Sequence, residues 1–161
     1  MLKQTAVDVM TRAEITLSPE DSIYEATKRL LKHRLFGAPV VDSDGRLLGM
    51  LTDRECFGAV AGQALDGLPD GSVQDYMAHD VETVSQDASL YELISKFRSS
   101  THRKFPVVDR EGRVVGQVSR RDTLIALERI HDNSYLYGSK DETQAEVEGV
   151  DSAMRRARRP R

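Results

Sequence analysis

The sequence predicts an α+β fold built from two tandem βαββα repeats. The first observation is an internal repeat: a shift of 67 positions aligns residues 8–55 with residues 75–122 without a gap, and 15 of the 48 paired positions are identical. The second is that each copy alternates a helix-type apolar stripe with short β-branched runs. The third is a glycine-containing turn between two such runs in both copies. A unit of this kind needs its neighbour to bury its apolar face.

Each copy begins with a short strand and a helix. We expect the first strands at 14–17 and 81–84. Helices should begin at Ser22 and Ser89, because a glutamate follows each serine three residues later, which is the pattern of a capping box. Apolar residues at helical spacing should be buried: Ile23, Ala26, Leu30 and Leu31 in the first copy, and Leu90, Leu93, Ile94 and Phe97 in the second.

A β-hairpin and a second helix complete each copy. Gly45 and Gly112 supply the positive φ that a tight hairpin turn needs. The hairpin strands are predicted at 39–41 and 46–51 in the first copy, and at 106–108 and 113–118 in the second. The second helices open on further capping patterns, Thr52 with Glu55 and Ser119 with Asp122.

Two such copies can bury their sheets against each other, and we expect them to pack sheet to sheet with pseudo-twofold symmetry. We divide the chain into a first repeat at 1–66, a second repeat at 67–130 and a C-terminal tail at 131–161. A linker with turn residues spans 67–72. The tail, where five acids precede five arginines, is predicted to be partly helical or disordered.

Composition narrows the class of protein. The chain has 161 residues, of which 39% are hydrophobic, and a formal net charge of -3. It has no apolar stretch approaching the ~18 residues of a membrane helix, and its N-terminus has no apolar signal core. Cys56 is the only cysteine, so an internal disulfide is excluded and Cys56 is expected to be a small buried thiol. We therefore predict a cytoplasmic protein.

The repeated motifs resemble those of a tandem pair of CBS domains, or Bateman module, over about residues 5 to 128. The resemblance rests on the Asp-x-Met triplets, on P-V-V-D-x-[DE]-G-R-x-x-G in both copies and on the closing [TS]-x-x-[DE]. It implies a regulatory module that binds an adenosyl compound in clefts between the repeats and commonly dimerises into a flat disc. No cofactor is required, and the ligands that it implies include AMP, ADP, ATP, NAD and S-adenosylmethionine.

The second copy has the chemistry for an anionic nucleotide. Ser119 opens a helix, where free backbone N–H groups and the dipole favour an anion. Asp122, one turn on, can accept from both hydroxyls of a ribose, and the resemblance implies the same roles for the two residues. Four cationic side chains suited to phosphate lie nearby in the sequence: Arg103, Lys104, Arg120 and Arg121. The resemblance also implies adenosine-lining segments at Ser18, Ile23, Ser85 and Leu90.

Two alternatives stay open at these positions. Ser119 and Asp122 would also appear as a helix cap with no ligand at all, and the arginines as a solvated face. The first copy predicts a weaker second cleft, because Phe36 and Gly37 stand opposite Arg103 and Lys104. There Thr52 keeps the hydroxyl, but the longer Glu55 replaces the aspartate. Binding is therefore predicted to be asymmetric.

Three hypotheses of function follow, and none is enzymatic, since no catalytic motif and no metal-ligand spacing of the histidines occurs in the sequence. The first is an adenine-nucleotide sensor that acts in trans on a protein target the sequence does not identify. The second is a ligand-free dimerisation scaffold. The third is nucleic-acid binding through the arginine tail at 155–161, which we rank below the others. We expect a homodimer and no membrane association.

Overall fold

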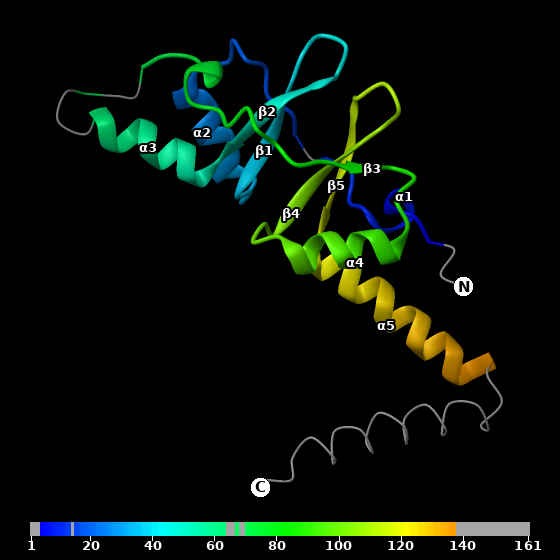
Figure 1. Ribbon diagram of the computed structural model, residues 1–161. Coiled ribbons are helices and arrows are strands. Elements are labelled where there is room, and N and C mark those ends of the chain that lie inside the picture. The colour runs from blue at the N-terminus through cyan, green and yellow to red at the C-terminus, as the bar shows by residue number, and fades with distance from the viewer. Residues whose placement is uncertain (1–3, 14, 64–66, 68–69, 138–161) are drawn as a thin grey trace, which may run out of the picture. The chain divides into compact units, whose positions relative to one another are not determined.

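The computed structural model describes residues 4–13, 15–63, 67 and 70–137 and contains two antiparallel hairpins with their helices (Figure 1). The described residues up to Thr123 form one compact unit, and those from Leu124 belong to a second. The elements are α1 (Ala6–Val9), α2 (Ile23–Lys32), β1 (Gly37–Val41), β2 (Leu47–Thr52), α3 (Asp53–Gln63), the 3-10 turn η1 (Val73–Asp75), β3 (Val84–Ser85), α4 (Leu90–Ser99), β4 (Lys104–Val108), β5 (Val114–Ser119) and α5 (Arg120–Tyr137).

Both predicted hairpins are confirmed, with equivalent registers. β1 pairs with β2 from Gly37 opposite Thr52, and β4 pairs with β5 from Lys104 opposite Ser119. Each turn glycine has a φ of 81°. In the first turn the Asp42 carboxylate accepts two backbone N–H bonds of 2.9 Å, and Asp109 makes the equivalent pair of bonds in the second. The turns are thus specified locally, as their sequences predict.

Two of the four predicted capping boxes form completely, at Ser89 and Ser119, and at Thr52 only the Glu55 carboxylate makes its cap bonds. The box at Ser22 was wrongly predicted. The Glu92 carboxylate accepts from the Ser89 N–H and hydroxyl at 2.7 Å each. Ser22 makes no side-chain cap bond, and Glu25 lies 3.2 Å from the Lys28 ammonium instead. Lys28 draws Glu25 away from the helix end, whereas the equivalent residue of the second copy is the uncharged Ser95.

The buried stripe of α2 is also narrower than predicted. Leu31 is 72% exposed, while Ile23, Ala26 and Leu30 are buried. The helix ends just past Leu31 in a tight C-terminal cap: the Leu35 N–H donates to the Leu30 carbonyl at 2.9 Å, and Arg34 adopts a left-handed φ of 54°. The chain therefore turns back over Leu30 and leaves Leu31 in solvent.

The first strands are shorter than predicted. Leu17 forms only an isolated parallel bridge with Val40, and Glu14 lies outside the described residues. In the second copy the strand is β3, so it covers only the end of the predicted 81–84 range and one residue more. β3 pairs in parallel with β4 and makes the second sheet three-stranded.

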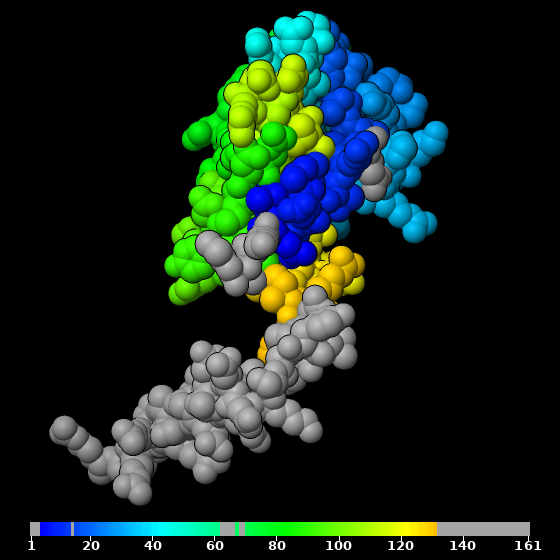
Figure 2. Space-filling view, turned by 90° about the vertical axis from the view of Figure 1, so that its right-hand side faces the viewer, coloured from blue at the N-terminus to red at the C-terminus, as the bar shows by residue number. Residues whose placement is uncertain are grey.

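The two copies exchange their leading segments, which we define as residues 4–13 and 70–80. Thr11 pairs with Gln117 of β5 through backbone bonds of 2.9 and 2.8 Å, and Ala78 pairs with Met50 of β2 through bonds of 2.8 and 2.9 Å. In Figure 2 the dark blue N-terminal segment lies directly against the green and yellow second copy. The two contacts are related by the repeat shift, which gives the unit its pseudo-twofold symmetry.

The exchange extends into the core. Val73 and Met77 of the second leading segment are buried in one cluster with the first copy's Leu17, Ile23 and other apolar side chains. The two hairpin turns are also joined, because the Leu47 N–H donates to the Gly112 carbonyl at 3.1 Å and the Val114 N–H donates to the Gly45 carbonyl at 3.0 Å. Each hairpin is thus packed by residues from both copies.

Beyond this unit, the described part of the predicted tail is helical, since α5 reaches Tyr137. Residues 138–161, with the acid-rich and arginine-rich runs, lie outside the described residues. None of the helices that are described combines the length and the apolar character needed to cross a membrane.

Candidate functional site

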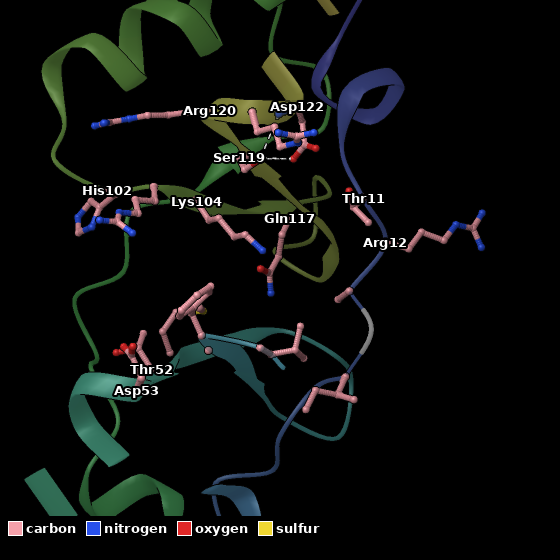
Figure 3. Close-up of a pocket in the computed structure, with 18 residues that line it drawn as sticks. Thr11, Arg12, Thr52, Asp53, His102, Lys104, Gln117, Ser119, Arg120 and Asp122 are labelled. Carbon is pink, nitrogen blue, oxygen red and sulfur yellow. Dashed lines mark hydrogen bonds between the residues drawn. The ribbon is translucent and has the colours of Figure 1, made fainter. Parts of the chain in front are cut away.

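A cavity of about 960 Å³ lies between the two hairpins (Figure 3). It is bounded by β2 and the start of α3 on one side, and by β4, β5 and the start of α5 on the other. Its lining is drawn from the exchanged leading segment and from both copies: Thr11, Arg12, Ala13, Ile15, Leu35, Phe36, Gly37, Met50, Thr52, Asp53, His102, Arg103, Lys104, Gln117, Ser119, Arg120, Arg121 and Asp122.

The two walls of this cavity differ in chemistry. The first copy and its adjoining segment contribute apolar side chains, among them Ile15, Leu35 and Met50, and Phe36, which is 73% exposed. The second copy contributes polar and cationic side chains. Figure 3 shows Lys104 and Gln117 pointing into the space between the hairpins, whereas Arg12 points away from it. One wall can therefore contact an aromatic ring, and the other can bind an anion.

Ser119 and Asp122 lie together at the start of α5, as predicted. One carboxylate oxygen of Asp122 accepts from the Ser119 N–H at 2.8 Å and from its hydroxyl at 2.6 Å, and the Asp122 N–H donates back to that hydroxyl at 3.1 Å. The helix cap that the sequence predicts is therefore present in the structure. The cap does not exclude ligand binding, because it uses one carboxylate oxygen and Asp122 still lines the cavity.

The four predicted cationic residues all line the cavity, but they are not equivalent. Arg103 and Lys104 lie where the chain enters β4, and both are exposed. Arg121 is exposed one residue into α5. The Arg120 guanidinium instead donates to the backbone carbonyl of Ser100 at 2.6 Å, and Figure 3 shows its side chain extending away from Ser119 and Asp122.

Three of the four residues predicted for a weaker first-copy cleft lie at this same cavity. Phe36, Gly37 and Thr52 line the same space as the second-copy residues, because the two hairpins face each other across it. Glu55 is not in the lining, since its carboxylate closes the Thr52 cap by accepting from the Thr52 N–H at 3.0 Å and from its hydroxyl. The lining residue of this helix start is Asp53.

Four residues suggested by the resemblance lie outside the cavity lining. Ile23 and Leu90 have no exposed surface and pack in the core as the first residues of α2 and α4. The Ser18 hydroxyl donates to Glu20, and Ser85 is an exposed residue of β3. The structure therefore does not bring these four side chains to Ser119 and Asp122.

Several lining residues were missed. Gln117 and Met50 stand two positions before Ser119 and Thr52 on their strands, and residues two apart on a strand share a face. That spacing was a usable signal. Thr11, Arg12 and Ala13 of the first leading segment gave no comparable signal, because only the exchange of segments brings them to the cavity.

The cysteine and the histidines give no sign of catalytic or metal chemistry among the described residues. Cys56 is buried in the first core, as predicted, and burial raises the pKa of its thiol. His102 lines the cavity with its imidazole 3.6 Å from the Glu82 carboxylate. Among the residues the structure describes, no group of three or more histidine, cysteine or acidic side chains is arranged to hold a metal ion.

The sequence matches the CBS domain family twice, at residues 6–62 and 73–129. The chain belongs to this family. The two matches follow the internal repeat, so the chain is a tandem CBS pair. Its α+β fold of two repeated units is thereby confirmed.

Solved CBS structures and curated relatives resemble the chain over most of its length. A CBS domain pair solved with 5-methylthioadenosine and S-adenosyl-L-methionine is 27% identical, with a TM-score of 0.63, over 81% of this chain and 98% of that one. A CBS protein solved with AMP shares the fold, with a TM-score of 0.68 and 22% identity over 79% of this chain and 98% of that one. An inosine-5'-monophosphate dehydrogenase of Methanocaldococcus jannaschii is 29% identical over 119 residues, which are 74% of this chain and 23% of the enzyme.

Proposed function

We propose that this CBS pair is a regulatory module that binds an adenosyl ligand, such as an adenine nucleotide, in the cavity between its hairpins. The observation that supports the proposal is that apolar side chains gather on the first-copy wall of that cavity, beside Thr52 and Asp53, and cationic side chains on the second-copy wall, beside Asp122. An adenosyl phosphate is divided in the same way, with a flat aromatic base at one end and an anion at the other. The bound ligands of the related structures, AMP, S-adenosyl-L-methionine and 5-methylthioadenosine, belong to the same class.

In this proposal the base lies against the first-copy wall and the phosphate against the second-copy wall. Phe36 offers an aromatic face for stacking, which contributes about 0.5–1.5 kcal/mol for ring pairs. Arg103, Lys104 and Arg121 neutralise the phosphate, and hydrogen bonds to such charged groups are the stronger ones. The unengaged carboxylate oxygen of Asp122 accepts from a ribose hydroxyl. The ligand is thus oriented by the difference between the copies.

Occupancy would bridge residues of both copies and stabilise one relative arrangement of the hairpins. That arrangement would be sensed by a protein partner acting in trans, in the cytoplasm, and the module itself would catalyse no reaction. A ligand that bridges two packed units can shift their equilibrium only by its difference in affinity for the two arrangements.

Thermal unfolding with a panel of ligands tests the proposal. AMP, ADP, ATP, NAD and S-adenosylmethionine are added separately, and at about 100 times its Kd a true ligand stabilises the folded state by about 2.7 kcal/mol. Inosine and inorganic phosphate are controls that lack the adenine or the nucleoside. If none of the five compounds raises the unfolding temperature, the sensor is ruled out and the ligand-free scaffold takes its place.

We also propose that the module is a homodimer. Phe57 and Val60 lie three residues apart on α3, so they share a helix face, and they are 74% and 42% exposed. The position equivalent to Phe57 in the second copy is Leu124, which is 65% exposed. Apolar side chains repeated at equivalent exposed positions are typical of a surface that a second copy covers.

Sedimentation equilibrium tests the dimer. The wild-type protein is expected to sediment as a dimer at micromolar concentration, and Phe57→Ser is expected to shift it toward monomer by about tenfold or more in the dimer dissociation constant. Leu48→Ser, on an exposed position of β2, is the control and should leave the dimer intact. A monomeric wild-type protein would contradict the proposal.

A further inference from the structure

We infer that Arg120 is a positioning residue: it fastens the basic segment, residues 102–104, to the start of α5 and so holds the phosphate-binding side chains at the cavity. This inference rests on the proposed function. Arg120 forms two bonds to the chain that leads into β4. Its backbone N–H donates to the Arg103 carbonyl at 3.2 Å, and its guanidinium donates to the Ser100 carbonyl at 2.6 Å.

The two bonds span the connection between α4 and β4. Their acceptors, Ser100 and Arg103, are three residues apart, and His102 lies between them. The donor is the residue next to Ser119, whose side chain forms the cap with Asp122. The two bonds of Arg120 therefore fix the backbone of the basic segment relative to Ser119 and Asp122, which are the proposed phosphate and ribose contacts.

The first copy holds its equivalent connection differently. The Asp53 N–H donates to the Phe36 carbonyl at 2.8 Å, which matches the backbone bond of Arg120. The other attachment is the C-terminal cap of α2, where Arg34 is left-handed and the Leu35 N–H donates to the Leu30 carbonyl. α4 instead ends at Ser100 in an extended conformation, with a φ of -120° and a ψ of 151°.

The side-chain bond of Arg120 thus replaces a helix cap. Across the described connection from Ser100 to Arg103, the structure has no bond back to α4 of the kind that Leu35 makes to α2. His102, within this connection, makes two further contacts: its N–H donates to the Ser100 hydroxyl at 3.0 Å, and its imidazole lies near the Glu82 carboxylate. The aspartate at position 53 cannot make this bond, because a carboxylate does not donate to a carbonyl.

Arg120, which the sequence predicts as a direct ligand contact, is thereby assigned a positioning role. A guanidinium that donates to a backbone carbonyl and extends away from Ser119 and Asp122 acts on the ligand through the segment it holds (Figure 3). Arg121, its neighbour, has the same charge and lines the cavity. Removing either arginine changes the net charge equally, so the two variants separate positioning from charge.

Hydrogen exchange and AMP binding together test the inference, with Arg120→Ala, Arg120→Lys and Arg121→Ala compared with wild type. Without ligand, Arg120→Ala should raise amide exchange across residues 101–105 by about tenfold, because a loop with fewer anchors opens more often. Arg121→Ala should leave that exchange unchanged. AMP affinity should fall about tenfold in Arg120→Ala, and Arg120→Lys, which keeps a cationic hydrogen-bond donor, should recover part of both effects.

Each outcome decides the matter. If wild type binds AMP and Arg120→Ala loses affinity with unchanged exchange, Arg120 contacts the ligand directly and the inference is wrong. If Arg120→Ala binds AMP as wild type does, the positioning role is also wrong, while the proposed function stands. If wild type binds none of the adenosyl probes, the proposed function fails, and the role of Arg120 in binding fails with it.

Discussion

Gly49→Ala is expected to lower the free energy of unfolding by about 1–3 kcal/mol, because the added methyl has no room in the packed exchange. A Cβ at Gly49 would lie 2.6 Å from the Ala78 carbonyl oxygen and 2.9 Å from the Met77 sulfur. The Ala78 carbonyl is fixed by its 2.9 Å bond from the Met50 N–H. The substitution therefore pushes the second leading segment off β2. Urea denaturation monitored by circular dichroism measures the loss.

Gly116, the equivalent of Gly49 in the second copy, provides a second test of the exchange, and Gly58 provides a control. Gly116→Ala should cost a similar amount, because its Cβ would lie 2.6 Å from the Met10 sulfur and 2.7 Å from the Thr11 carbonyl oxygen. Gly58 lies inside α3 with open space around it, so Gly58→Ala should stabilise the protein by about 0.5–1 kcal/mol. If all three substitutions act alike, the leading segments do not exchange as described.

The same two glycines illustrate what the sequence could predict. They belong to the repeated motif, so their equivalence was evident, and the turns, hairpins and two complete caps are local patterns that follow from a few adjacent residues. The exchange is a long-range contact between Thr11 and Gln117, and no local pattern encodes which copy a leading segment joins. The wrongly predicted cap at Ser22 has a local cause, since Lys28 competes for Glu25.

For the candidate site, the sequence predicted which side chains lie near one another better than it predicted the shape of the cavity. Ser119, Asp122 and the cationic residues do meet at one cavity, because they flank a single hairpin and its helix. The shape of the cavity depends on how the two hairpins face each other, which periodicity does not determine. Ile23 and Leu90 were assigned to the ligand by resemblance, although their positions at the start of apolar helix stripes already indicated burial.

Asp122→Ala is expected to remove about half of the stabilisation by AMP, and Glu55→Ala is expected to preserve it. The two carboxylates form the same cap in their copies, Asp122 with Ser119 and Glu55 with Thr52. Without ligand, each variant should therefore lose about 1 kcal/mol of stability from the cap alone. Asp122 lines the cavity and Glu55 does not, so only the first substitution removes a proposed ribose contact.

The measurement is the thermal unfolding of both variants with and without AMP. Wild type and Glu55→Ala should each gain about 2.7 kcal/mol at 100 times the wild-type Kd. A tenfold weaker Kd would reduce the gain in Asp122→Ala to about 1.4 kcal/mol, since the gain depends on the logarithm of the ratio of ligand concentration to Kd. Equal gains in the two variants would mean that Asp122 serves the helix cap alone. A loss confined to Glu55→Ala would place the ligand at the first copy, opposite to the orientation proposed from the charges of the cavity.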